Sequence, residues 1–340
     1  MGRCDRFRKS FVRILKILAV YALVAAIIFV HRVQVFAVDE KNKAREAIRT
    51  GFYGFCETID ISEYGVSPEE LSFLFSSIIK DDPYLFFVDT TMSYSFEPGG
   101  RVLTLRPSYK IRGEEVFGAW EFCRDWVKML ALEAMEYTTD AERALYLHDR
   151  ICRFAEYDKT LESDNLFSFL KSGKATCQAY TLAYIAVLRE CGIKASYVAS
   201  DTIEHIWNCV KIDGEWYHVD LTWDDSAATT PGSVSRRHFL LSDKAAEERG
   251  HRDWYSFEVA VCSSDKYVDF NFDSGAEVMH LAGDGNHDGR VELVDLLNMR
   301  RYLSLKRSDE LCSNCLDLNA DGSVDNADVE TLRKKLLGAH

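Results

Sequence analysis

The chain has 340 residues, 47% of them hydrophobic, which is enough to build the cores of two or three domains. The formal net charge of -13 is uneven, because residues 1–37 carry +6 and the remainder therefore carries -19. A body this acidic repels phosphates, which argues against nucleic acid as a partner.

Residues 1–37 have the order of a secretory signal peptide. Six basic residues within the first sixteen positions precede an uncharged run from Ile17 to Val30. This run of fourteen residues is short for a membrane span, and Val35-Phe36-Ala37 fits the small-residue cleavage pattern, so cleavage before Val38 is favoured. An uncleaved membrane anchor is the alternative, because extending the run back to Ile14 lengthens it. Under both interpretations we expect the body to lie outside the cytoplasm.

Residues 38–130 are predicted to form a small α+β domain, in which no catalytic set of residues is recognised. The sequence Ser67-Pro68-Glu69-Glu70 is a helix-start signal, and a turn at residues 97–100 precedes a strand-like run. The predicted helices are Lys43–Cys56, Ser67–Lys80 and Val116–Tyr137, and the predicted strands are Tyr84–Val88 and Arg101–Arg106.

Residues 173–225 contain the candidate catalytic residues, beginning with a cysteine at a helix start. The apolar spacing after Thr176 predicts a helix with Thr176 as its N-cap and Gly192 as its stop. Cys177 then lies in the first helical turn, where unpaired N–H groups and the helix dipole favour the nucleophilic thiolate. The predicted apolar face consists of Ala179, Leu182, Ala183, Ala186 and Val187.

The stretch that follows predicts a β-hairpin around Asp213-Gly214, a strong two-residue turn signal. The two strands would be His205–Ile212 and Glu215–Thr222, with Ile212 paired to Glu215. This register makes His205 and Asp220 diagonal neighbours on one face, roughly 7–8 Å apart at Cα and within side-chain reach. A histidine and the carboxylate that orients it need this arrangement.

Cys177, His205 and Asp220 together are typical of nucleophilic catalysis at an acyl carbon. Cys177 would attack, His205 would move the proton, and Asp220 would hold the imidazole tautomer. The backbone N–H of Cys177 would be one oxyanion donor. Each residue alone is compatible with an ordinary structural role, and His148 and His218 are predicted to be structural. Trp207, Trp216 and Trp223 are predicted to pack around the site and shield it from water.

The runs TCQAYTLAYIAVLRECGI and EHIWNCVKIDGEWYHVDLTWDD resemble the transglutaminase-like superfamily in its bacterial extracellular branch. The similarity extends to ALYLHDRICRFAEYD upstream and RRHFLLSD downstream, and the family's Cys, His and Asp fall on Cys177, His205 and Asp220. The resemblance implies a papain-like α+β core at residues 131–272. It also implies hydrolysis or acyl transfer at amide bonds of a peptide or protein, including the formation of protein crosslinks. A binding module that keeps the fold without turnover is the alternative.

Nine of the ten cysteines lie outside the targeting segment, which contains Cys4. If Cys177 is a free nucleophile, an even number remains, but the sequence does not determine any pairing, and free buried thiols are equally compatible. Cys312-x-x-Cys315 has no second pair, which argues against a zinc site. The remaining cysteines are Cys56, Cys123, Cys152, Cys191, Cys209, Cys262, Cys312 and Cys315.

Two segments near the C-terminus match each other at a spacing of 33 residues. Oxygen-bearing side chains at loop positions 1, 3, 5, 9 and 12, with glycine at position 6, follow the logic of a calcium loop, and position 7 contributes a backbone carbonyl. Each loop precedes a predicted helix, Leu293–Leu303 or Ala327–Leu337. The predicted calcium-ligating positions are Asp284, Asn286, Asp288, Arg290, Glu292 and Asp295, and Asp317, Asn319, Asp321, Ser323, Asp325 and Asp328.

The duplicated loop-plus-helix pattern differs from an EF-hand pair, because Asp replaces Glu at position 12 and neither loop has a convincing entering helix. It resembles a type I dockerin over residues 281–340. This resemblance implies an all-α domain that binds two calcium ions and docks onto a cohesin module of a scaffoldin. The chain is therefore predicted to be a secreted, modular α+β protein that works in an extracellular or cell-surface complex of the cellulosome type.

Overall fold

The computed structural model describes residues 40–226, 234–257, 261–270, 282–283, 285, 291, 295–297, 299–300, 303, 313–319 and 321–337. The predicted signal segment and most of the first calcium loop lie outside these residues. No helix in the described part is long and apolar enough to cross a membrane. The described residues form two compact units, one of residues 40–79 and 87–113, the other of residues 80–86 and 114 onward. The predicted domain boundary after residue 130 stays a prediction.

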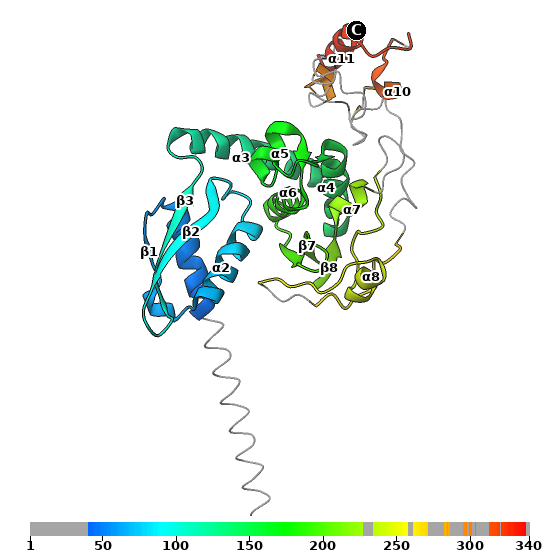
Figure 1. The fold of residues 1–340 in the computed structure, drawn as a ribbon. Coiled ribbons are helices and arrows are strands. Elements are labelled where there is room, and N and C mark those ends of the chain that lie inside the picture. The colour runs from blue at the N-terminus through cyan, green and yellow to red at the C-terminus, as the bar shows by residue number, and fades with distance from the viewer. Residues whose placement is uncertain are drawn as a thin grey trace, which may run out of the picture. The chain divides into compact units, whose positions relative to one another are not determined.

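The first unit combines helices with a three-stranded antiparallel sheet in the order β1-β3-β2 (Figure 1). The helix at residues 40–53 packs closely on the sheet, since a Cβ added at Gly51 would lie 2.5 Å from the Ile59 side chain. Ser67 and Glu70 form the predicted helix start through two reciprocal hydrogen bonds of 3.0 and 3.3 Å. The other elements are β1 (Ile59–Asp60), the short 3-10 helix η1 (Ser62–Tyr64), α2 (Pro68–Asp81), β2 (Val88–Phe96) and β3 (Val102–Tyr109).

The predicted strand Tyr84–Val88 is wrong, because β2 begins only at Val88. The Asp82 carboxylate accepts the backbone N–H of Tyr84 at 3.1 Å and so forms a turn. The apolar run Leu85–Phe87 is buried as irregular chain rather than as a strand. Strand β2 contains many threonine, serine and aromatic residues, and most of its side chains are exposed or half-buried. The other predicted strand, Arg101–Arg106, is confirmed except for its first residue, because β3 begins at Val102.

The second unit contains the predicted helix, the predicted hairpin and the C-terminal repeat. Its long helices are α3 (Glu114–Ala134), α4 (Asp140–Phe154) and α6 (Cys177–Glu190), and its main sheet has the order β6-β7-β8. Further elements are β4 (Glu156–Tyr157), α5 (Leu166–Ser172), β5 (Lys174–Ala175), β6 (Ala195–Ser200), β7 (His205–Ile212), β8 (Glu215–Val219), α7 (Leu221–Ser226), α8 (Asp243–Glu248), α10 (Ser313–Leu316) and α11 (Asn326–Leu336).

Helix α6 is the centre of this unit (Figure 1). It contacts α3, α4, α5 and strands β6 and β7, and every residue from Ala179 to Leu188 is buried. The predicted apolar face is therefore confirmed, and its burial extends around the whole helix. Two hydrogen bonds fix the helix against β7: the Thr181 hydroxyl donates to the Ile206 carbonyl at 3.3 Å, and the Asn208 amide donates to the Thr181 carbonyl at 3.1 Å. The start of α6 is thereby held close to the start of β7.

The predicted hairpin register is confirmed from the Ile212–Glu215 pair onward. Asp213 and Gly214 both have positive φ, +53° and +86°, as the expected two-residue turn requires. The predicted second strand is too long, because β8 ends at Val219 and α7 begins at Leu221. Asp220 lies between them and accepts the backbone N–H of Trp223 at 3.1 Å, the bond of an N-cap residue.

The C-terminal repeat has a small core to which both halves contribute. Leu296 and Met299 from the first half pack with Leu316, Val329 and Leu332 from the second. Helix α11 closely matches the predicted helix after the second loop. After the first loop, the described residues 295–297, 299–300 and 303 are helical, as predicted.

Candidate functional sites

Cys177 is the first residue of α6 and is partly buried. Thr176 is the N-cap, as predicted, and its hydroxyl accepts the backbone N–H of Ala179 at 3.4 Å. The N–H of Thr176 donates to the Ser163 carbonyl at 3.0 Å, which fixes the chain just before the helix. By helix geometry, the N–H groups of Cys177 and its successor have no intrahelical acceptor and are free to bind an anion.

The structure brings His205 and Asp220 together, as the hairpin register predicts. The His205 Nε2 atom lies 2.7 Å from the Asp220 carboxylate, and the Cys177 thiol is near enough to the imidazole to raise its pKa. Because Nε2 is bonded to Asp220, Nδ1 is the ring atom left to face the sulfur. All three predicted residues therefore meet at one place, where the start of α6 meets the start of β7 and the end of β8.

Electrostatics favour a charged imidazole at this place. Burial by itself would lower the pKa of His205, but the adjacent Asp220 carboxylate and the contact with Cys177 raise it to about 10. Burial would likewise raise the pKa of Asp220, yet its bonds to His205 and His251 hold that pKa well below its usual range. The pair is therefore an imidazolium bonded to a carboxylate at neutral pH, with only 8% and 1% of the two side chains exposed.

His251 is a site residue that sequence reasoning missed. Its Nε2 lies 2.9 Å from the same Asp220 oxygen that binds His205. Burial lowers the pKa of His251, so the ring is neutral and donates its single N–H to the carboxylate. Its Nδ1 is buried with no hydrogen-bond partner. No sequence signal marks this residue, because it lies 31 positions after Asp220 and follows a turn.

Two tryptophans enclose the histidine, as predicted. The rings of Trp207 and Trp223 stack near that of His205, with centroid distances of 5.7 and 5.1 Å. The same two indoles lie 4.5 and 4.2 Å from the ring of His251. This aromatic box keeps water from the ion pair and so strengthens its hydrogen bonds. Trp216 instead packs against the apolar cluster that contains Trp207 and Cys209.

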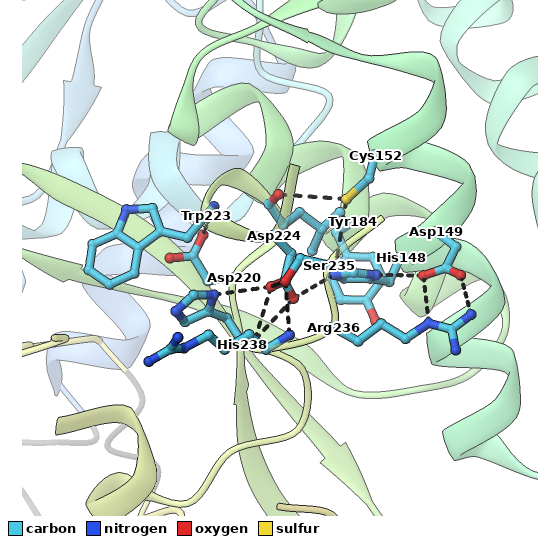
Figure 2. A network of polar contacts seen from close by, with 12 residues as sticks. His148, Asp149, Cys152, Tyr184, Asp220, Trp223, Asp224, Ser235, Arg236 and His238 are labelled. Atoms are coloured by element: carbon cyan, nitrogen blue, oxygen red, sulfur yellow. Dashed lines mark hydrogen bonds and ion pairs between the residues drawn. The ribbon is translucent and has the colours of Figure 1, made fainter. Parts of the chain in front are cut away.

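A second buried polar network lies next to the site (Figure 2). Its central carboxylate, Asp224, binds His148 at 3.2 Å and His238 at 3.0 Å. Burial alone would lower the pKa of His148, but Cys152 and the carboxylates of Asp149 and Asp224 raise it well above its usual value. Arg236 completes the network with a 2.7 Å contact to Asp149.

This network positions the chain that supports Asp220. Asp224 is one helical turn after Asp220 on α7, and its oxygens also accept the backbone N–H of His238 at 3.0 and 3.1 Å. The carbonyl of His238 in turn accepts the backbone N–H of Asp220 at 2.9 Å. His148 is thus bonded within the interior, consistent with the structural role predicted for it. His218 is bonded similarly, to Asp243 at 2.8 Å.

The second predicted calcium loop is largely described and fits a hard cation. The carboxylate of Asp317 accepts the N–H groups of Asp321 and Gly322 at 3.1 and 2.8 Å, and Asn319 bonds Asp321 at 2.8 Å. Gly322 has φ +87°, so a residue with a side chain would be strained at the tight turn. Carboxylate and amide oxygens gathered around such a turn are the donors that calcium takes.

The last predicted ligand plays the same structural part in both loops. Asp328 is buried and accepts the N–H of Leu318, at loop position 2, at 2.8 Å. Asp295 is also buried and accepts the N–H of Gly285, the equivalent residue of the first loop, at 3.0 Å. The repeat seen in the sequence is therefore also a repeat of contacts. The predicted ligands Asp284, Asn286, Asp288, Arg290 and Glu292 lie outside the described residues.

Two family models match the chain. Residues 128–221 match the transglutaminase-like superfamily, and residues 282–337 match the type I dockerin domain. The chain therefore carries a transglutaminase-like domain, which contains Cys177, His205 and Asp220, and a type I dockerin domain, a kind of domain that binds calcium. His251 lies beyond the matched range.

Among solved structures, the chain is similar to a crystal structure of a TGase at 13% identity and a TM-score of 0.31, covering 54% of this chain and 49% of that one. It is also similar to a provisionally assigned cysteine protease from Cytophaga hutchinsonii, at 13% identity and a TM-score of 0.27, covering 49% of this chain and 71% of that one. The chain spans about half the length of the TGase structure. No curated protein matches the chain.

Proposed function

We propose that Cys177, His205 and Asp220 form the catalytic triad of an enzyme that acts on amide bonds of a peptide or protein. One observation carries this proposal: a buried imidazole bonds a carboxylate at 2.7 Å and is near a thiol at the start of a helix, which raises the pKa of the ring. A nucleophile, a base and a group that orients the base are what acyl transfer requires. Three residues with purely structural roles would have no reason to meet in this order.

In the first half-reaction, the Cys177 sulfur attacks the amide carbonyl carbon and the carbonyl electron pair moves to oxygen. The backbone N–H of Cys177 is positioned to donate to this oxyanion. The imidazolium of His205 then gives its Nδ1 proton to the leaving nitrogen as the C–N bond breaks. The products are a thioester on Cys177, a free amine or ammonia, and a neutral His205.

In the second half-reaction, His205 removes a proton from the incoming nucleophile, which attacks the thioester carbon. Water yields a carboxylic acid, and an amine yields a new amide or a protein crosslink. Either route breaks the C–S bond, returns the sulfur as a thiolate and leaves His205 protonated. Asp220 remains ionised throughout, because its carboxylate stabilises the imidazolium and fixes the ring orientation. His251 and Trp223 act as positioning residues, since both donate N–H groups to that carboxylate.

The test is the rate at which iodoacetamide labels Cys177 in the native protein at pH 7. We expect labelling much faster than that of the partly buried Cys191, and a loss of this advantage in His205→Ala. Cys177→Ala is the background control, and Cys191→Ala is the matched variant that removes another partly buried thiol. Labelling in wild type that does not exceed the Cys177→Ala background would overturn the proposal.

The alternative is a binding module that keeps the fold without turnover. Incubation with glutamine peptides and a primary amine, followed by mass spectrometry, separates the possibilities. Release of ammonia with a new acid shows hydrolysis, and incorporation of the amine shows transfer. A peptide that binds but is returned unchanged, even though Cys177 is reactive, would favour the binding module.

The dockerin domain is proposed to bind two calcium ions, one in each loop, and to attach the exported protein to a cohesin module of a scaffoldin. When bound, each ion would neutralise the clustered carboxylates and so complete the fold of its loop. Calorimetric titration should therefore show about two sites, which Asp288→Ala combined with Asp321→Ala removes together with cohesin binding. The reactivity of Cys177 should be unchanged in this variant. Cohesin affinity that persists in the variant would contradict the proposal.

A further inference from the structure

A pair of buried cysteines, one of them on β7, lies outside the groups used in the proposed mechanism. The Cys209 sulfur, on β7, is 3.7 Å from the Cys262 sulfur, 53 residues further along the chain. Both thiols are free and almost completely inaccessible, at 1% and 0% exposure. This distance is van der Waals contact, and a disulfide requires the sulfurs to approach to about 2.05 Å.

We propose that Cys209 and Cys262 are joined by a disulfide bond in the exported protein. The bond forms by thiol–disulfide exchange with an oxidant of the disulfide class: the two thiols lose two protons and two electrons, an S–S bond forms, and the oxidant is reduced to two thiols. The inference rests on export, since disulfides persist in oxidising compartments. It does not depend on whether Cys177 is catalytic.

A metal ion is the competing explanation, because His218 lies beside the same sulfurs. Its Nδ1 is 3.6 Å from the Cys209 sulfur, and the three groups could together hold a soft metal. The Trp207 indole N–H, however, donates to this Nδ1 at 3.0 Å, and an indole nitrogen can only donate. The lone pair that a metal would need is therefore occupied. The sulfurs are left facing each other among apolar side chains.

The timing of bond formation follows from burial. The contact with Cys209 and the apolar surroundings raise the pKa of Cys262, which suppresses the reactive thiolate once the chain has folded. Oxidation is thus expected while the chain folds after export, and the finished bond would be shielded from reductants. The loop that it closes contains Asp220, Trp223 and His251. The disulfide would therefore restrain the unfolded chain over the segment that contains these three residues.

Peptide mapping of the full chain tests this inference directly. The protein is produced in an oxidising bacterial periplasm, denatured with N-ethylmaleimide but without reductant, and cut with trypsin. The sequence places Cys209 alone in peptide 195–211 and Cys262 alone in peptide 253–266. We expect these peptides joined, two hydrogen atoms lighter than their sum and separable by reductant. Peptide 113–124, which contains the buried Cys123, is the internal control and should be alkylated.

Alkylation of both Cys209 and Cys262 without reductant would overturn the inference, and so would zinc bound in equal amount to the protein and released by a thiol reagent. Denaturing and refolding in reductant should lower Tm by about 10 °C in wild type, as a loop of this size predicts, and should have no effect in Cys209→Ala/Cys262→Ala. Cys123→Ala is the matched variant in which the effect of reductant should remain. The peptide map decides the question even where the double variant fails to fold.

Discussion

Replacing Asp220 with asparagine tests the central ion pair of the proposed site, because it removes the charge and keeps the shape. The carboxylate accepts N–H groups from Trp223, His205 and His251 at 3.1, 2.7 and 2.9 Å. Asparagine has one acceptor oxygen and one NH2 group. Its NH2 would therefore face at least one of the N–H groups that now donate to the carboxylate. Both imidazoles bind one carboxylate oxygen and the Trp223 N–H binds the other, so the amide NH2 meets either the Trp223 N–H or both imidazoles.

The magnitude follows from the pKa of His205. With that pKa at about 10, the imidazolium exceeds the neutral ring by roughly 10³ to 1 at pH 7. Without the carboxylate, the interaction with Cys177 alone opposes burial, so the pKa of His205 falls and fewer rings are charged at pH 7. Leaving-group protonation and the ion pair that holds the ring are lost together. A decrease in kcat of about 10³–10⁴-fold is expected, as for the same change in another triad.

The assay is an NMR titration of the histidine ring signals, combined with the rate of amide turnover. In wild type the His205 signals should shift with a midpoint near pH 10, and in Asp220→Asn with a midpoint below pH 8. Asp243→Asn is the matched control, because it removes a carboxylate from His218 instead and should leave both the His205 midpoint and the turnover rate unchanged. A His205 midpoint that stays above pH 8 in Asp220→Asn would refute the reasoning.

Three further outcomes are expected. The pKa of His205 is raised on folding, so the stability that this residue gives the folded state is complete below about pH 6.5 and is lost as the pH rises toward 10. In urea unfolding, the free energy of unfolding should fall above pH 6.5, by up to about 1.4 kcal/mol per pH unit for this residue. A free energy of unfolding that does not depend on pH would contradict the assignment. His251→Phe removes one N–H from the Asp220 carboxylate and should lower kcat about 10- to 100-fold with little change in KM; His251→Gln should recover part of the loss, and equal losses in both variants would indicate a packing role. Asp317→Ala should remove one of two calcium sites in a calorimetric titration, and an unchanged stoichiometry would count against the assigned loop.

Local sequence patterns predicted the parts of the site that depend on neighbouring residues. Thr176 followed by apolar spacing was sufficient to place Cys177 at a helix start, because capping and amphipathic periodicity are short-range. Asp213-Gly214 was sufficient to fix the hairpin register, because that turn has few allowed geometries. Where the pattern was ambiguous the prediction failed: the apolar run Leu85–Phe87 is buried without forming a strand.

Tertiary structure alone decided which distant groups complete the site. His251 reaches Asp220 across 31 residues, and Cys209 reaches Cys262 across 53, and no local pattern records either encounter. The same holds for His148, which folding places between the carboxylates of Asp149 and Asp224. The sequence by itself determined the helix start at Cys177, the strand that begins at His205 and the repeated loops of the dockerin domain, since their spacing is set by one helix, one turn and one repeat. The contacts of His251, Cys209 and His148 were decided by packing, since these residues meet their partners only when the folded core excludes water around them.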